Sequence, residues 1–161
     1  MIIRPARQPD VAGILLLAAE VEHWFGSMVD EPGFHLAVDE HIRRRTALVA
    51  VNGPEVLGAL MFDATGPTYH VDWLVIAEQA RGTGLGRALM TDAIHRFVHS
   101  PATIEVITFG ADHPGAVESG ARVFYERLGF IPGPPTDPGP EGGSRQIYTR
   151  TFTGNRRIFG A

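Results

Sequence analysis

Three glycines at alternate positions, Gly82, Gly84 and Gly86, form the stretch of this sequence whose residue types most directly suggest chemistry. They lie between an apolar run typical of a strand and an amphipathic segment typical of a helix. Because glycine lacks a Cβ, such a turn can adopt positive φ angles and direct several backbone N–H groups outward. The helix start adds unpaired N–H groups and the positive end of the helix dipole. These features, with Arg81 and Arg87 beside them, predict a site for phosphate oxygens.

The spacing of the glycines excludes two common phosphate-binding motifs. A dinucleotide-binding G-x-G-x-x-G motif that starts at Gly82 would need glycine where the sequence has Arg87. A P-loop would need Gly-Lys-Ser/Thr at the end of the turn, and the turn contains no lysine. A turn that serves only strand-to-helix geometry is the remaining alternative.

The residues around the glycines resemble the acetyl-CoA loop of the GNAT acyltransferases. The matching pattern is Gln79-x-x-Gly82-x-Gly84, and a second segment, 121–130, is similar to the A-x-x-x-Y-x-x-x-G-F segment of that family. Tyr125 occupies the tyrosine position of this segment. Two separate motifs in the correct order are more specific than either alone. The resemblance covers most of the chain and is strongest from Thr46 onward.

The resemblance implies that acetyl-CoA is the cosubstrate. The glycine turn would bind its pyrophosphate, and the end of the preceding strand would pair with its pantetheine arm. The residues expected to bind it are Leu74, Val75, Ile76, Arg81, Gly82, Thr83, Gly84, Leu85, Gly86, Arg87, Glu118 and Tyr125. Glu118 stands where many family members have an asparagine, and a carboxylate cannot donate a hydrogen bond as an amide does.

The resemblance also assigns two catalytic roles. A backbone N–H at a strand bulge, from Leu74 or Val75, would stabilise charge on the thioester oxygen. Tyr125 would be the general acid for the departing thiolate, because a phenol with a pKa near 10 is protonated at neutral pH. A tyrosine that only packs between helix and sheet is the alternative.

An ammonium acceptor must lose a proton before it attacks, and three side chains are candidates for the base: Asp72, His70 and Glu105. On a period of two, His70, Asp72 and Leu74 share one face of a strand, and polar groups on a buried strand need partners or a use. We expect Asp72 to be the base, with a structural hydrogen bond as its alternative role.

The segment between the first two predicted helices, 23–34, is expected to be a loop. In the resembled family this loop lines the acceptor pocket, so His23, Trp24 and Phe25 are expected to bind substrate together with His70 and Glu105. Core packing of Trp24 is an equally good interpretation.

The elements that must position these residues follow from hydrophobic periodicity and turn signals. Helices are predicted over 10–22, 34–45, 85–98 and 116–128. Strands are predicted over 1–6, 47–51, 56–62, 68–76, 103–109 and 146–152, with another that starts at 130–131. The Pro/Gly-rich segment 132–144 is predicted to be a mobile tract without core residues.

Composition narrows the functional class. The 161 residues are 44% hydrophobic and 20% charged, which is typical of a globular protein. The net charge of −4 argues against a nucleic-acid partner. The absence of cysteine excludes disulfides and thiolate metal sites, and no histidine spacing supports a metal. No apolar run is long enough to span a membrane, so a cytoplasmic location is expected.

These observations predict one α/β domain over 1–153 and a loose tail over 154–161. The domain is expected to have a mixed, mostly antiparallel sheet with helices on both faces and a splayed parallel strand pair at its centre. The predicted activity is acetyl transfer to the amine of a small molecule or peptide, by direct attack in a ternary complex, because no cysteine can carry the acyl group. The alternative is a CoA-binding module without turnover. A homodimer is common in the resembled family.

Overall fold

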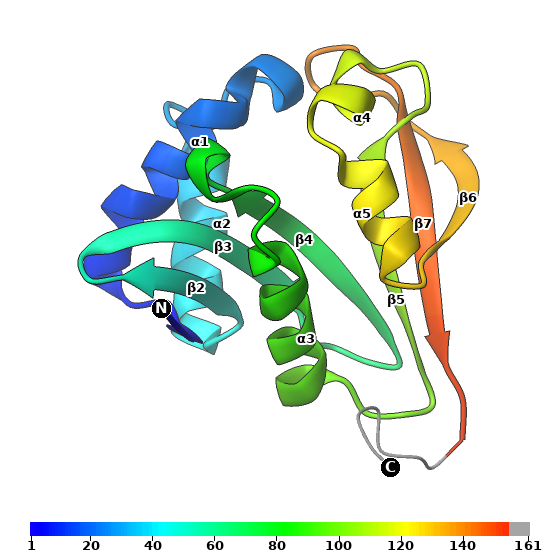
Figure 1. Cartoon of the computed structure of the whole chain (residues 1–161), viewed down its shortest axis with the longest axis horizontal. Coiled ribbons are helices and arrows are strands. Elements are labelled where there is room, and N and C mark those ends of the chain that lie inside the picture. The colour runs from blue at the N-terminus through cyan, green and yellow to red at the C-terminus, as the bar shows by residue number, and fades with distance from the viewer. Residues whose placement is uncertain (155–161) are drawn as a thin grey trace.

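A computed structural model of the chain describes residues 1–154. Within these residues, seven strands form one mixed sheet in the order β1-β2-β3-β4-β5-β7-β6 (Figure 1). The strands are β1 (Ile2–Pro5), β2 (Ala47–Asn52), β3 (Glu55–Asp63), β4 (Thr68–Ile76), β5 (Ala102–Phe109), β6 (Ile131–Thr136) and β7 (Arg145–Phe152). The predicted C-terminal tail, apart from residue 154, lies outside the described residues.

Helices cover both faces of this sheet, as predicted. They are α1 (Val11–Phe25), α2 (Pro32–Arg44), α3 (Leu85–Phe97), α4 (Pro114–Glu118) and α5 (Ala121–Arg127), with short 3-10 turns η1 (Gln8–Asp10) and η2 (Glu78–Ala80). A Cβ at Gly13 of α1 would meet Val56, and one at Gly58 would meet Leu89 of α3. In the pairing with β2, Ala50 lies opposite Gly58 and Val51 lies opposite Val56, so Leu57 is an extra residue in a bulge and Val56 and Gly58 point to opposite faces. Helices α1 and α3 therefore cover opposite faces of the sheet. Figure 1 shows α2 behind the sheet and α3 in front of it.

The centre of the sheet opens between β4 and β5. These strands are the predicted parallel pair, and they pair only from Thr68 to Val71 against Thr103 to Val106. Beyond that point they diverge, as Figure 1 shows. The splay divides the sheet into a half with β1 to β4 and a half with β5 to β7.

The strand alternation predicted for β4 is wrong after residue 71. Met61 of β3 pairs with Trp73 and Phe62 pairs with Val71, so Asp72 is an extra residue with no partner on β3. This bulge shifts the alternation by one residue. Leu74 therefore lies on the α3 face of the sheet, opposite the face of Asp72. Periodicity could not reveal the bulge, because the extra residue is visible only against the neighbouring strand.

Three other predicted boundaries are wrong. Helix α1 continues to Phe25, so residues 23–25 of the expected loop form its last turn. The single helix predicted over 116–128 is two helices, because Gly120 has a φ of 68° and interrupts it. The Pro/Gly-rich segment is not irregular throughout, since β6 extends to Thr136 and pairs with β7.

None of the helices in the described part of the chain is long and apolar enough to cross a membrane.

Candidate active site

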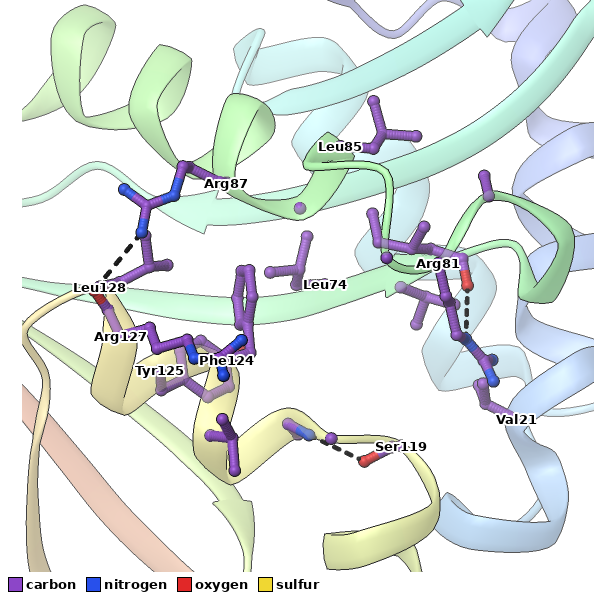
Figure 2. A pocket seen from close by; sticks show the side chains of 18 of the residues that line it. Val21, Leu74, Arg81, Leu85, Arg87, Ser119, Phe124, Tyr125, Arg127 and Leu128 are labelled. Carbon is purple, nitrogen blue, oxygen red and sulfur yellow. Dashed lines mark hydrogen bonds between the residues drawn. The ribbon is translucent and has the colours of Figure 1, made fainter.

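A cavity of about 650 Å³ occupies the α3 side of the splay (Figure 2). Its walls come from the end of β4, the glycine turn with the start of α3, the end of α1, and helix α5. The predicted cofactor-binding residues that line it are Leu74, Val75, Ile76, Arg81, Gly82, Gly84, Leu85, Gly86, Arg87 and Tyr125. Thr83 and Glu118 are not among the lining residues.

The glycine turn leaves the start of α3 free to bind a ligand. Gly82 and Gly84 have φ angles of 76° and 85°, and no atom within 4 Å would meet a Cβ at either position. Gly84 is the N-cap of α3 and provides no side-chain cap, so the first N–H groups of the helix lack a side-chain acceptor there. Gly86 has a packing role, since its Cβ would lie 2.9 Å from the Phe124 ring.

The end of β4 presents backbone groups at the splay. Leu74, Val75 and Ile76 pair with β3, whereas the pairing of β4 with β5 ends at Val71 and Val106. Within the described residues, no strand pairs with the other edge of this segment. A strand edge with unpaired N–H and C=O groups is suited to bind an extended ligand.

Tyr125 faces this segment from α5. Its residue is 6% exposed and lines the cavity. The centroids of the Phe124 and Phe130 rings lie 5.0 and 5.6 Å from the centroid of the Tyr125 ring. Burial raises the pKa of the Tyr125 phenol above its ordinary value. The hydroxyl makes no hydrogen bond within residues 1–154, so its proton is available to a ligand.

Aromatic residues at the end of α1 close the far end of the cavity. The indole of Trp24 donates a 2.8 Å hydrogen bond to the Glu118 carboxylate on α4. The Arg81 guanidinium lies 5.1 Å from the Trp24 ring centroid and also donates to the Ile76 carbonyl. Phe25 stacks on Phe109 of β5 at 4.8 Å. Trp24 and Phe25 line the cavity, whereas His23 does not.

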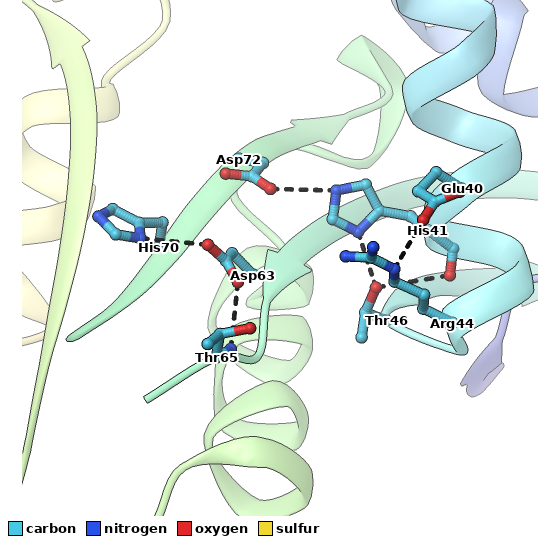
Figure 3. A network of polar contacts seen from close by, with 8 residues as sticks. All are labelled: Glu40, His41, Arg44, Thr46, Asp63, Thr65, His70 and Asp72. Atoms are coloured by element: carbon cyan, nitrogen blue, oxygen red, sulfur yellow. Dashed lines mark hydrogen bonds and ion pairs between the residues drawn. The ribbon is translucent and has the colours of Figure 1, made fainter. Parts of the chain in front are cut away.

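The base candidates lie on the other face of the sheet, outside the cavity lining (Figure 3). Asp72 is 3.0 Å from His41 of α2, and His70 is 3.6 Å from Glu105 of β5. The expectation that His70 and Asp72 are buried is wrong, because their side chains are 43% and 42% exposed. The described residues contain no cluster of three His, Asp or Glu placed to hold a metal ion.

Several lining residues were not anticipated from the sequence: Val21, Ala80, Phe109, Ser119, Gly120, Ala121, Val123, Phe124, Arg127 and Leu128. Helical spacing could have found part of this set. Ala121 and Leu128 lie four and three residues from Tyr125 and therefore on the same side of a helix. Phe109 of β5 lies at the site beside Phe25, the last residue of α1. The sequence did not indicate that α1 extends as far as Phe25.

The sequence matches the model of a protein family described as "Acetyltransferase (GNAT) domain" over residues 43–132, more than half of the chain. No curated protein gives a significant match.

Solved structures that resemble this chain share its fold over almost its full length. Ribosomal-protein-alanine N-acetyltransferase from Brucella melitensis is 18% identical, with a TM-score of 0.72 over 94% of this chain and 100% of the other. Ard1 from Thermoplasma volcanium is 14% identical, with a TM-score of 0.72 over 95% and 98%. Aminoglycoside 6'-acetyltransferase type Ii is 19% identical, with a TM-score of 0.64 over 94% and 97%.

Proposed function

The chain belongs to the acetyltransferase (GNAT) domain family, and from this premise we propose that it transfers an acetyl group from acetyl-CoA to a primary amine. The observation that supports this most strongly is the meeting of three features in one cavity. These are the unpaired edge of β4, the open start of α3, and the buried phenol of Tyr125.

The cavity fits both polar parts of acetyl-CoA. The N–H groups at Gly82 to Gly86 and the dipole of α3 suit a pyrophosphate, which needs donors without intervening side chains. The edge at Leu74 to Ile76 suits the amide groups of the pantetheine arm, which would pair with it as an added strand does. Acetyl-CoA supplies the reactive thioester.

Two groups in the cavity suit the transfer itself. A backbone N–H of Leu74 or Val75 would donate to the thioester oxygen as negative charge develops there. Tyr125 would donate its proton to the departing sulfur. The raised pKa of its phenol keeps that proton in place at neutral pH.

The acceptor amine would reach the splay from the opposite face, where Asp72 lies. His41 holds the Asp72 carboxylate at 3.0 Å, while its other ring nitrogen is 2.7 Å from the Thr46 hydroxyl. We propose Asp72 as the group that accepts the ammonium proton, with His70 and Glu105 as the alternative bases. Because the bulge puts Asp72 and Leu74 on opposite faces of β4, a base at Asp72 would act from the side of the strand opposite the proposed thioester site.

The acceptor class remains a primary amine on a small molecule or a peptide. The names of the similar structures include both a ribosomal-protein alanine acceptor and an aminoglycoside. At identities below a fifth, these names do not select one of the two for this chain.

Replacement of Tyr125 by phenylalanine tests the proposed function. Since its hydroxyl has no partner among the described residues, the Tyr125→Phe substitution leaves none of their buried groups unpaired and is expected to preserve the fold. We expect unchanged affinity for acetyl-CoA and a turnover rate lower by about 10²- to 10⁴-fold, as for loss of a general acid. Release of the CoA thiol would be measured with a polyamine, an aminoglycoside, an amino acid and a peptide with a free N-terminus.

Two results would contradict parts of this proposal. Equal turnover by the wild-type and Tyr125→Phe proteins would remove Tyr125 from catalysis. Tight binding of acetyl-CoA without turnover of any amine would indicate a CoA-binding module instead of an enzyme.

A further inference from the structure

Three arginines from different elements gather at one end of the cavity. Arg87 of α3 donates to the main-chain carbonyl of Arg127, the last residue of α5, at 3.5 Å. Arg150 of β7 lies against the turn after α5, with its Nε 3.7 Å from the position that a Cβ would take on Gly129. Arg87 and Arg127 line the cavity. Figure 2 shows them at the end opposite Arg81.

Among residues 1–154, these guanidinium groups have no acidic partner. Within the described residues, Arg87, Arg127 and Arg150 form no ion pair, whereas Arg4 pairs with Asp10 and Arg44 pairs with Glu40. Burial, and to a smaller extent the charge of Arg87, lowers the pKa of Arg150. The whole sequence carries a net charge of −4, so this local excess of positive charge is not a consequence of composition. Like charges held together in this way are stabilised by an anion.

The position of the cluster identifies which anion. Arg87 follows Gly84 by three residues, so its Cα lies about 4.5 Å further along the axis of α3 than the glycine turn. The turn offers backbone N–H groups and suits a pyrophosphate diester. The arginine cluster offers full charges, and a phosphate monoester carries about −1.5 to −2 charges at neutral pH. Guanidinium forks bind such a group with two parallel hydrogen bonds.

We propose that Arg87 and Arg127, supported by the charge of Arg150, bind the 3′-phosphate monoester of coenzyme A. The chain thereby discriminates coenzyme A from 3′-dephospho-coenzyme A. This inference rests on the proposed use of acetyl-CoA, and it adds a charge-based selection that the glycine turn alone does not provide.

Calorimetric titration with coenzyme A and with 3′-dephospho-coenzyme A tests this selection. We expect the wild-type protein to bind coenzyme A about 10- to 100-fold more tightly, as for one or two hydrogen bonds between charged groups. In the variants Arg127→Gln and Arg87→Gln, this ratio should fall toward one, because only the affinity for coenzyme A decreases. Added salt should also lower the wild-type ratio.

Arg43→Gln is the matched control, because Arg43 is an exposed arginine that pairs with Glu40 on α2. Its affinity ratio should equal that of the wild type. Arg87 and Arg127 are themselves exposed, so their variants are expected to fold. Circular dichroism of each variant would check this.

Equal affinity of the wild-type protein for both forms of coenzyme A would overturn the inference while the acetyltransferase proposal stands. An unchanged ratio in both arginine variants would do the same. If the wild-type protein binds neither coenzyme A nor acetyl-CoA, both the inference and the proposed function are wrong.

Discussion

At the scale of single residues, burial determines the chemistry of Tyr125. Its ring packs against Phe124, Phe130 and Tyr148, and the low exposure of its phenol disfavours the charged form. As the proposed general acid, the buried Tyr125 phenol keeps its proton at every pH at which the enzyme would work. Loss of activity on the alkaline side should therefore not come from ionisation of Tyr125.

The raised pKa of Tyr125 predicts a loss of stability at alkaline pH. In the unfolded chain the phenol ionises near pH 10, while in the folded chain it keeps its proton to a higher pH. Between these two values the folded state binds more protons, so the free energy of unfolding falls as pH rises above about 10. Urea unfolding at a series of pH values should show a shallower decline for Tyr125→Phe than for the wild type.

Burial also raises the pKa of Tyr148. Part of the alkaline decline in the free energy of unfolding is therefore expected to persist in the Tyr125→Phe variant. The Tyr148→Phe variant measures this second contribution. Identical pH dependence in the wild-type and Tyr125→Phe proteins would contradict the assignment of a raised pKa to Tyr125.

At this scale, the residues found from the sequence are those whose type is tied to a local motif. Gly82, Gly84 and Tyr125 belong to short motifs whose residues themselves indicate the local backbone conformation. All three line the cavity. Trp24 was also expected at the site, but its bonding partner, like the contribution of Arg127 to the cavity, depends on contacts between distant elements. The Trp24 bond to Glu118 joins α1 to α4, and no spacing along the chain reports such a contact.

At the scale of elements, the turn between β4 and α3 carries the proposed pyrophosphate site, and its backbone conformation can be tested separately from its ligand. Gly84→Ala introduces a Cβ at a φ of 85° in open surroundings. Gly53→Ala introduces one at a φ of 59°, also in open surroundings, in the turn between β2 and β3. Each should lower the free energy of unfolding by about 1–2 kcal/mol, the cost of a left-handed conformation for a residue with a Cβ.

Only the Gly84→Ala variant should also lose affinity for acetyl-CoA, because only that turn is proposed to contact the ligand. Calorimetry on both variants makes the comparison. Equal affinities in the two variants would mean that the glycines of this turn serve strand-to-helix geometry alone.

The order and type of the elements could be predicted because each has its own periodicity and its own turn residues. The irregularities could not be predicted, since they depend on neighbouring elements. The bulge at Asp72 depends on the register with β3, and the last turn of α1 continues because Trp24 and Phe25 pack across the splay onto Phe109. The break at Gly120 is local, and its glycine was a signal for it.

At the scale of the whole molecule, contacts at both ends of the splay join the two halves of the sheet. The halves join through the short β4–β5 pairing at one end of the splay and through the end of α1 at the other. The 2.8 Å hydrogen bond from Trp24 to Glu118 crosses between the halves, and so does the stack of Phe25 on Phe109. A third contact, from Arg87 of α3 to the Arg127 carbonyl of α5, also joins the walls of the cavity.

A double-mutant cycle measures the second connection. Trp24→Phe removes the donor and Glu118→Ala removes the acceptor, and the double variant reports whether the two losses are independent. We expect a coupling of about 0.5–1.5 kcal/mol in the free energy of unfolding, as for one hydrogen bond. Strictly additive losses in urea unfolding would show that this bond does not hold the two halves together.

The proposed function depends above all on the binding of acetyl-CoA in the cavity. The most direct test is calorimetric titration of the wild-type protein with acetyl-CoA, and in parallel with ATP and NAD. The expected result is saturable binding of acetyl-CoA with far weaker binding of the two nucleotides, because only acetyl-CoA has a pantetheine arm to pair with the edge of β4. Equal binding of all three ligands would make the glycine turn a generic phosphate site. Binding of none would contradict the acetyltransferase function itself.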